Sequence, residues 1–205
     1  MNIKTRYTRR IALIAVLSLF FALKVQAAGP LEHLRLTVHK ALQILKDPKL
    51  LSEDKKNERV HRLMNVVNPI ISYDEIAKRS LGVHWQRQAP SKQQEFVRLF
   101  RRFLEKVYSS KIPLYDGETV VFAGEATQGD FTRVDGNIVN KKGEKSSVVF
   151  KLQRLDGKWK IYDLVVKNIS LTDNYRAQFD RVIANSSYEE LVKKIKNKTG
   201  SKGSP

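Results

Sequence analysis

The chain has 205 residues, of which 38 are lysine or arginine and 21 are acidic, so its formal net charge at pH 7 is +17. This length is sufficient for one domain with a real hydrophobic core. The absence of cysteine from the sequence excludes disulfides, thiol catalysis and cysteine-ligated metals.

Residues 1–27 have the pattern of a secretory signal peptide. The segment MNIKTRYTRR is basic and contains no acid, and the apolar run IALIAVLSLFFAL follows it. The run is about 13 residues long, whereas a membrane-spanning helix needs about 20. Val25 and Ala27 stand where a signal peptidase requires small residues. We therefore predict export, cleavage near Ala27 and a mature chain that begins near Ala28.

The mature chain remains basic. The signal segment holds five of the 38 basic residues and none of the 21 acidic ones, which leaves a formal net charge of +12. A basic exported protein can bind an anionic membrane surface, an acidic protein or nucleic acid. Export argues against nucleic acid, and basic residues spread over amphipathic helices can equally be an ordinary solvated face.

Apolar residues at helical spacing predict four helices in the first half of the mature chain. They cover residues 30–48, 52–69, 72–82 and 90–113. The apolar faces of the first two include Leu34, Val38, Met64 and Val67. Proline ends the first, the second and the fourth helix, and Ser72 with Glu75 forms a capping box at the start of the third.

The segment 90–113 is the strongest helix prediction, and Ser91 with Gln94 forms a capping box near its start. Its wide apolar face suits a helix that covers a sheet, a lipid-filled space or an ordinary core. That face consists of Phe96, Leu99, Phe100, Phe103, Leu104, Val107 and Tyr108. Aromatic and basic residues interleave here as in some nucleic-acid-binding proteins. Helical spacing points the two kinds to different faces, so we predict no nucleic-acid partner.

Residues 119–171 change to a β-rich pattern. The apolar segments TVVFAGEA, FTRVDGNIVN, KSSVVFKLQRL and WKIYDLVVKNISL are separated by the turn sequences TQGD, NKKGE and LDGK. Alternation places Val148, Phe150 and Leu152 on one face, whereas the last segment is apolar on both faces. The pattern predicts an antiparallel meander of about four strands.

The C-terminal part returns to helical spacing. The segment 172–185 is one predicted helix, and a second begins with a capping box formed by Ser187 and Glu190. The order of helices, meander and helices predicts an α+β fold in which helices cover one face of a curved sheet. We expect a single domain over residues 28–197 and a disordered tail over residues 198–205.

The sequence offers few candidates for catalysis or metal binding. It contains no glycine-rich phosphate loop and no GxSxG or HExxH motif. The four histidines have no partner at metal-ligand spacing, so we predict no metal site. Asp163 lies in an apolar strand, where burial can raise the pKa of a carboxyl group and make it a general base. The alternative is a structural carboxylate that caps a turn or pairs with a basic residue.

Two segments of the sequence are characteristic of a known family. They are LGVHWQRQAPSKQQEFVRLFRRFLEKVYSSKIPLYDGE, residues 81–118, and WKIYDLVVKNISLTDNYRAQF, residues 159–179. Both resemble the MlaC or toluene-tolerance (Ttg2D-like) family of periplasmic phospholipid-binding proteins, which serve an ABC transporter. The most specific pieces are the Leu81-Gly82…Trp85 group, the YDGE tetrapeptide and the SLTDNYRAQF motif. Asn168 departs from the family pattern, which often has glycine there, and this makes the local backbone bend a point to examine.

The resemblance implies an NTF2-like fold in which a curved sheet and helices enclose a deep apolar cavity. It implies that the acyl chains of a phospholipid occupy the cavity as cargo, with no cofactor and no catalytic residue. It also implies a periplasmic location and transient docking on two partners, an inner-membrane Mla ABC transporter complex and an outer-membrane lipoprotein–porin complex. The function implied is a shuttle that helps to maintain the lipid asymmetry of the outer membrane.

On this basis we predict that large apolar residues line a lipid-binding cavity, although each of them can equally belong to a solid core. The predicted lining residues are Phe100, Leu104, Tyr108, Phe122, Val134, Phe150, Leu152, Trp159 and Val165. Two other functions stay open, because a fold does not fix a function. One is an NTF2-like enzyme with Asp163 as general base, and the other is an adaptor with a filled core.

Overall fold

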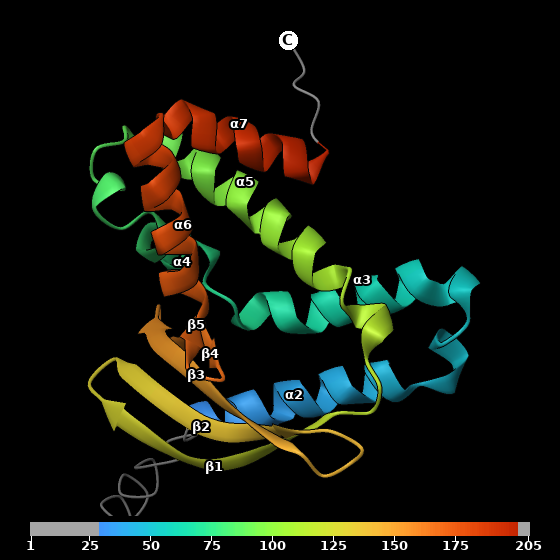
Figure 1. Ribbon diagram of the computed structural model, residues 1–205. Coiled ribbons are helices and arrows are strands. Elements are labelled where there is room, and N and C mark those ends of the chain that lie inside the picture. The colour runs from blue at the N-terminus through green and yellow to red at the C-terminus, as the bar shows by residue number, and fades with distance from the viewer. Residues whose placement is uncertain (1–28, 201–205) are drawn as a thin grey trace, which may run out of the picture.

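The computed structural model describes residues 29–200 (Figure 1). The predicted signal peptide and the last five residues of the predicted tail lie outside this range. Within residues 29–200, no helix combines the length and the apolar character that a membrane crossing requires.

Helices occupy both ends of the described chain and strands occupy its middle. The helices are α2 (Pro30–Lys46), α3 (Lys56–Val67), α4 (Tyr73–Leu81), α5 (Pro90–Ser109), α6 (Leu171–Asn185) and α7 (Tyr188–Thr199). Short 3-10 helices at Pro48–Leu50, Glu53–Lys55, Asn68–Ile70, Gly82–His84 and Ile112–Leu114 connect them. The strands are β1 (Thr119–Gln128), β2 (Phe131–Val139), β3 (Lys145–Leu155), β4 (Lys158–Val166) and β5 (Ile169–Ser170).

Two of the three predicted capping boxes have the expected serine cap. The Ser72 hydroxyl accepts a hydrogen bond from the Glu75 N–H (3.4 Å), and the Ser187 hydroxyl accepts one from the Glu190 N–H (3.1 Å). The cap predicted at Ser91 is wrong. Helix α5 begins one residue earlier with proline at its first position, where the missing N–H costs nothing and the fixed φ suits a helix.

The strands form one antiparallel meander in the order β1-β2-β3-β4-β5. The segment that we predicted as the last strand is divided in two by a tight turn at Lys167 (φ 49°) and Asn168 (φ 65°). A two-residue turn with positive φ at both positions matches the twist of the strands that it joins. Asparagine tolerates this left-handed conformation better than other non-glycine residues, so the bend is kept without the glycine that the family often has.

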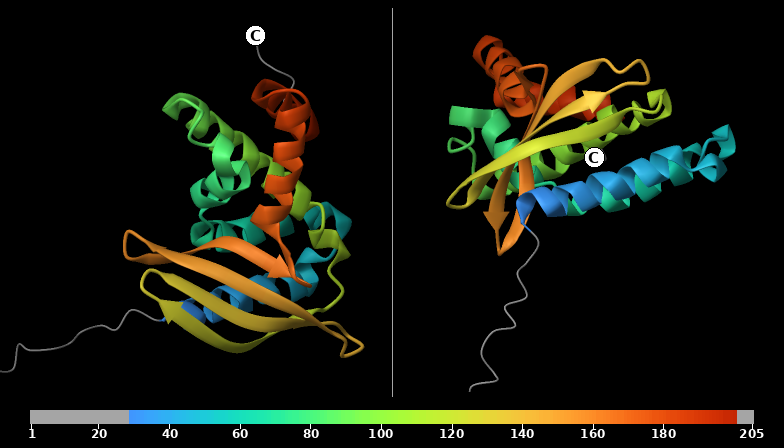
Figure 2. Two further views of the ribbon diagram at one scale, coloured as in Figure 1. Left: turned by 60° about the vertical axis from the view of Figure 1, so that its left-hand side comes forward. Right: turned by 90° about the horizontal axis from the view of Figure 1, so that it is seen from below.

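Irregularities in register curve the sheet. One lies in β1 between Phe122 and Gly124, opposite Gly136. The other lies between Lys151 and Leu152 of β3 and places an extra residue in β4. Such bulges bend a strand and increase its twist. Figure 2 shows the resulting curved, twisted sheet, with α2 and α3 together along one flank.

The buried apolar residues form two clusters. The helical cluster joins α4, α5, α6 and α7, and its largest members are Phe96, Phe100, Phe103 and Phe179. The sheet cluster joins Leu34 of α2 to Val134, Val148, Phe150 and Leu152 on one face of the sheet. In Figure 1 the helical cluster lies above the sheet, and α2 lies against the sheet. The predicted α+β fold, a curved antiparallel sheet with covering helices, is confirmed.

The C-terminal helix runs slightly further than predicted. Helix α7 ends at Thr199, and Gly200 follows in the left-handed conformation (φ 74°) that commonly terminates helices. The first two residues of the predicted tail, 198 and 199, are therefore helical.

Candidate functional site

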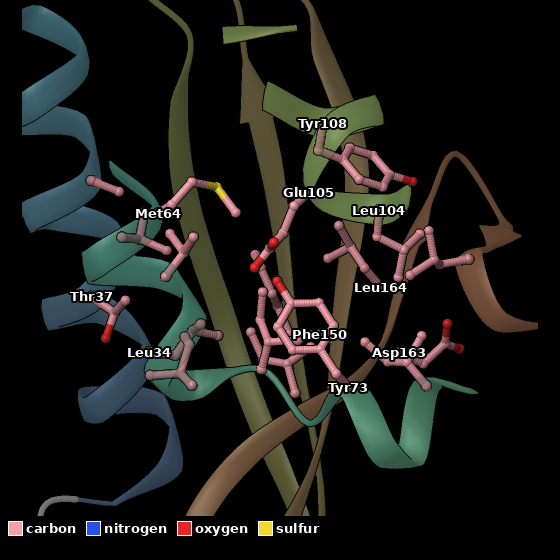
Figure 3. Close-up of a pocket in the computed structure, with 18 residues that line it drawn as sticks. Leu34, Thr37, Met64, Tyr73, Leu104, Glu105, Tyr108, Phe150, Asp163 and Leu164 are labelled. Atoms are coloured by element: carbon pink, nitrogen blue, oxygen red, sulfur yellow. The ribbon is translucent and has the colours of Figure 1, made fainter. Parts of the chain in front are cut away.

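A cavity of about 280 Å³ lies where the two clusters meet. It is bordered by α2 and α3 on one side and by α4, α5, β3, β4 and the start of α6 on the other (Figure 3). Nearly all of the surface that faces the cavity is carbon.

Three of the predicted lining residues face this cavity. Leu104 and Tyr108 reach it from α5, and Phe150 reaches it from β3. Figure 3 shows these side chains reaching the cavity from the end of α5 and from the sheet.

The remaining predicted residues lie elsewhere. Phe100 is fully buried in the helical cluster, where its ring stacks on Phe96 with 5.5 Å between the centroids. Val134 and Leu152 are fully buried inside the sheet cluster. Phe122 and Trp159 are partly buried and pack against the same cluster without reaching the cavity.

Val165 does not line the cavity because of the strand alternation in β4. Leu164 and Phe150 are paired across β3 and β4, and both face the cavity. Val165 is the next residue, so its side chain points to the opposite face of the sheet.

Sequence reasoning missed one whole wall of the cavity. That wall comes from α2, α3 and the segment after α3, and its residues are Leu34, Thr37, Val38, Ala41, Met64, Val67, Ile70 and Ile71. The signal was present in the sequence, since the apolar stripes of both helices include Leu34, Val38, Met64 and Val67. The apolar stripe of a helix does not by itself distinguish a face that lines a cavity from a face that packs against a neighbouring element.

The polar groups that reach the cavity are bonded to protein partners. The Tyr73 hydroxyl donates to the Asn68 side-chain oxygen (2.8 Å), and the Asn68 amide donates to the Glu105 carboxylate (3.0 Å). Arg101 also donates to that carboxylate (2.9 Å). Burial raises the pKa of Tyr73 to about 12, and the nearby Glu105 carboxylate adds to the effect. Tyr73 is therefore a neutral hydrogen-bond donor at pH 7. Because these polar groups bond to one another, the surface that faces the interior of the cavity is apolar.

Asp163 is held as a structural carboxylate. Its side chain is 2% exposed, and it accepts hydrogen bonds from the Thr172 N–H (3.1 Å) and the Ser170 hydroxyl (2.8 Å) at the start of α6. The Lys151 ammonium lies 3.0 Å from it. Burial by itself raises the pKa of Asp163, but these three groups outweigh burial and hold the pKa below its ordinary value.

A general base at neutral pH needs a pKa near the working pH. The lowered pKa of Asp163 and its saturated contacts therefore favour the structural alternative over the catalytic one. Among residues 29–200, no group of three or more histidine, aspartate or glutamate side chains is placed to hold a metal ion.

The sequence profile of the MlaC protein family matches residues 35–197. The chain belongs to the MlaC family. It is 26% identical over 172 residues to the toluene tolerance protein ttg2D of Pseudomonas putida, a match that covers 83% of this chain and 80% of that protein. It is also 19% identical over 136 residues to the intermembrane phospholipid transport system binding protein MlaC of Haemophilus influenzae, covering 64% of each chain.

The fold has a solved counterpart. A phospholipid-binding protein from Ralstonia solanacearum, determined in complex with a phospholipid, superposes with a TM-score of 0.73 and 21% sequence identity. The superposition covers 84% of this chain and 98% of that one. At this identity the likeness shows that the two proteins share a fold. The predicted resemblance to the MlaC family is confirmed by the match of the family profile.

The SLTDNYRAQF motif of this MlaC-family protein has a structural explanation. Ser170 caps α6 by accepting from the Asp173 N–H (3.1 Å) and donates to Asp163. Tyr175 and Phe179 place their rings edge-on to Phe100, with centroid distances of 5.1 and 5.2 Å. The motif therefore joins β4 to the helical cluster.

Proposed function

We propose that this protein binds a phospholipid with its acyl chains in the cavity between α2, α3, α5 and the sheet, and carries it between membranes without changing any bond. The observation that supports the proposal most directly is the apolar cavity itself, whose few polar neighbours are already bonded to one another. Membership of the MlaC family and the phospholipid-bound Ralstonia solanacearum protein of the same fold agree with it.

A carrier of this kind answers an energetic problem. Moving one methylene group from apolar surroundings into water costs about 0.8 kcal/mol. A lipid with roughly 30 methylenes therefore faces a barrier of roughly 20 kcal/mol or more when it crosses water alone. An apolar cavity replaces that barrier with a nearly balanced exchange between bilayer and protein. The predicted lining at Leu104, Tyr108 and Phe150 takes part directly.

The finer parts of the proposal are the location and the partners. We place the protein in the periplasm because of the predicted signal peptide. We assign it two docking partners, an inner-membrane Mla ABC transporter complex and an outer-membrane lipoprotein–porin complex. A passive cavity has no energy source, so the direction of net transport comes from these partners.

The test is to identify what the cavity holds. The protein is purified without added lipid and denatured, and the released molecules are identified by mass spectrometry. We expect about one phospholipid per chain. Ala41→Trp, which places an indole in the cavity from α2, should lower that ratio at least several-fold. Ala184→Trp adds the same group on the exposed side of α6 and should leave the ratio unchanged. A folded wild-type protein that releases no lipid would overturn the proposal.

A further inference from the structure

A second cavity of about 310 Å³ lies among α5, α6 and α7. It shares no lining residue with the first cavity. Its floor is formed by side chains of the helical cluster, among them Phe103, Phe179, Leu191 and Ile195, each less than 10% exposed. Because an unfilled apolar recess loses dispersion contacts on its lining atoms, this recess is a candidate for an apolar ligand.

The rim of the second cavity is polar and carries positive charge only. It is formed by Gln178 of α6 and by Lys194, Asn197 and Lys198 of α7, all of them exposed. No acidic residue lines the cavity. Within residues 29–200, Lys194 and Lys198 have no carboxylate within 4.0 Å. The other lysines of α7 differ, because Lys193 and Lys196 pair with Glu190 (3.6 Å) and Glu95 (3.0 Å).

The spacing of the two free lysines matters. Lys194 and Lys198 are four residues apart on α7, so they lie on the same face of the helix, one turn apart. An anionic group at the rim can therefore contact both ammonium groups while an attached chain lies on the apolar floor. A cavity of about 310 Å³ offers room for a single alkyl chain.

We propose that this second cavity binds a single-chain amphiphile with an anionic head, the chemistry shared by a fatty acid and an acidic lysophospholipid. Its chain would lie over Phe103, Phe179 and Ile195, and its head would pair with Lys194 and Lys198. The site adjoins the first cavity at one tyrosine pair. Tyr175 lines the second cavity, Tyr108 lines the first, and their hydroxyl groups interact.

The probe for the site is dodecanoate, a single-chain amphiphile with a carboxylate head. It is added below its micelle-forming concentration to 15N-labelled protein whose first cavity has been loaded with phospholipid. We expect saturable chemical-shift changes at the amides of Val182, Leu191 and Ile195. Dodecyltrimethylammonium has the same chain length and the opposite charge, and it should bind about fivefold or more weakly because the rim is cationic.

Two variants test the floor and the rim separately. Val182→Trp fills the recess and should abolish the shifts. The double variant K194E/K198E should weaken dodecanoate binding about fivefold or more. Its control is K158E/K193E, which makes the same change in net charge at exposed positions outside the cavity lining and should bind dodecanoate as the wild type does.

The outcomes separate this proposal from the function proposed for the first cavity. A protein that carries no phospholipid but still binds dodecanoate at α7 would refute only the function proposed for the first cavity. The proposal for the second cavity would be overturned if dodecanoate shifted only amides in the lining of the first cavity. It would also be overturned if K194E/K198E bound dodecanoate as tightly as the wild type does. Binding of an acidic amphipathic peptide at the same amides without any dodecanoate binding would overturn it too. A lysophosphatidylglycerol titration distinguishes the two lipid sources by relative affinity.

Discussion

Replacing Asp163 with asparagine is expected to destabilise the protein without removing any chemistry. Asparagine keeps the shape of the side chain and one oxygen that can accept from the Thr172 N–H. It loses the charge that pairs with Lys151 and the second oxygen, which accepts from the Ser170 hydroxyl. Loss of a hydrogen bond to a charged group costs about 1.5–3 kcal/mol. Breaking a fully buried ion pair costs about 3–5 kcal/mol, and Lys151 is about one-third exposed, so the charge contribution is smaller here. We expect a loss of about 2–3 kcal/mol at pH 7.

The pH dependence gives this prediction a second readout. The pKa of Asp163 is lowered in the folded protein, so its stabilising contribution is present above the unfolded value, about 3.9. That contribution is lost as the pH falls through the folded pKa. The stability gap between wild type and Asp163→Asn should therefore be constant from about pH 5 to pH 8 and should narrow below about pH 4.

The assay is urea denaturation of both proteins followed by circular dichroism at several pH values. Asp173→Asn is the matched control, since Asp173 lies at the same helix start but is 57% exposed in a surface pair with Arg176. It should cost less than about 1 kcal/mol. An Asp163→Asn protein as stable as the wild type at pH 7, or a gap that widens in acid, would refute the assignment of Asp163 as a buried cap.

Three further predictions test the backbone and the lining of the first cavity by chemical denaturation. Gly136→Ala should lower the free energy of unfolding by about 1–3 kcal/mol, because its Cβ would lie 2.8 Å from the Val121 carbonyl oxygen. Gly124→Ala is the control, since a Cβ there would have no atom within 4 Å, and it should leave the stability unchanged. Equal losses in the two variants would contradict the close approach at Gly136. Asn168→Gly should change the free energy of unfolding by less than about 0.5 kcal/mol, whereas Asn168→Val should lower it by about 1–2 kcal/mol. A valine variant as stable as the wild type would contradict the positive φ at this position. Tyr73→Phe should cost about 1 kcal/mol by removing the hydrogen bond to Asn68, and an unchanged stability would show that this bond contributes nothing.

The elements of the fold could be predicted because their signals are local. The apolar residues of α5 repeat at helical spacing. In the strand segments, which turn sequences bound, apolar and polar residues alternate, so the spacing within each segment indicates its secondary structure. The turn at Lys167 and Asn168 was missed because neither residue is glycine. The capping of α6 by Asp163 was left open because it joins two elements whose contact only the tertiary structure reveals.

The cavity lining could not be predicted with the same accuracy, because the decisive differences are smaller than sequence patterns resolve. Phe100 and Leu104 are four residues apart, so their directions around α5 differ by only about 40°. One faces the helical cluster and the other faces the cavity. In β4 the extra residue opposite Lys151 and Leu152 changes which side chains point to each face of the sheet, and no residue type in the segment predicts this bulge.

The tie between Asp163 and the start of α6 has a consequence for how cargo enters. Two hydrogen bonds fix the start of this helix to β4, and the Lys151 ion pair joins β4 to β3, so the sheet and the start of α6 are tied together on one side of the cavity. On the opposite side of the cavity, α2 packs against β1 and β2, whereas short 3-10 helices precede and follow α3. A two-tailed lipid is larger than a cavity of about 280 Å³, and we expect the extra width to come from an outward shift of α3.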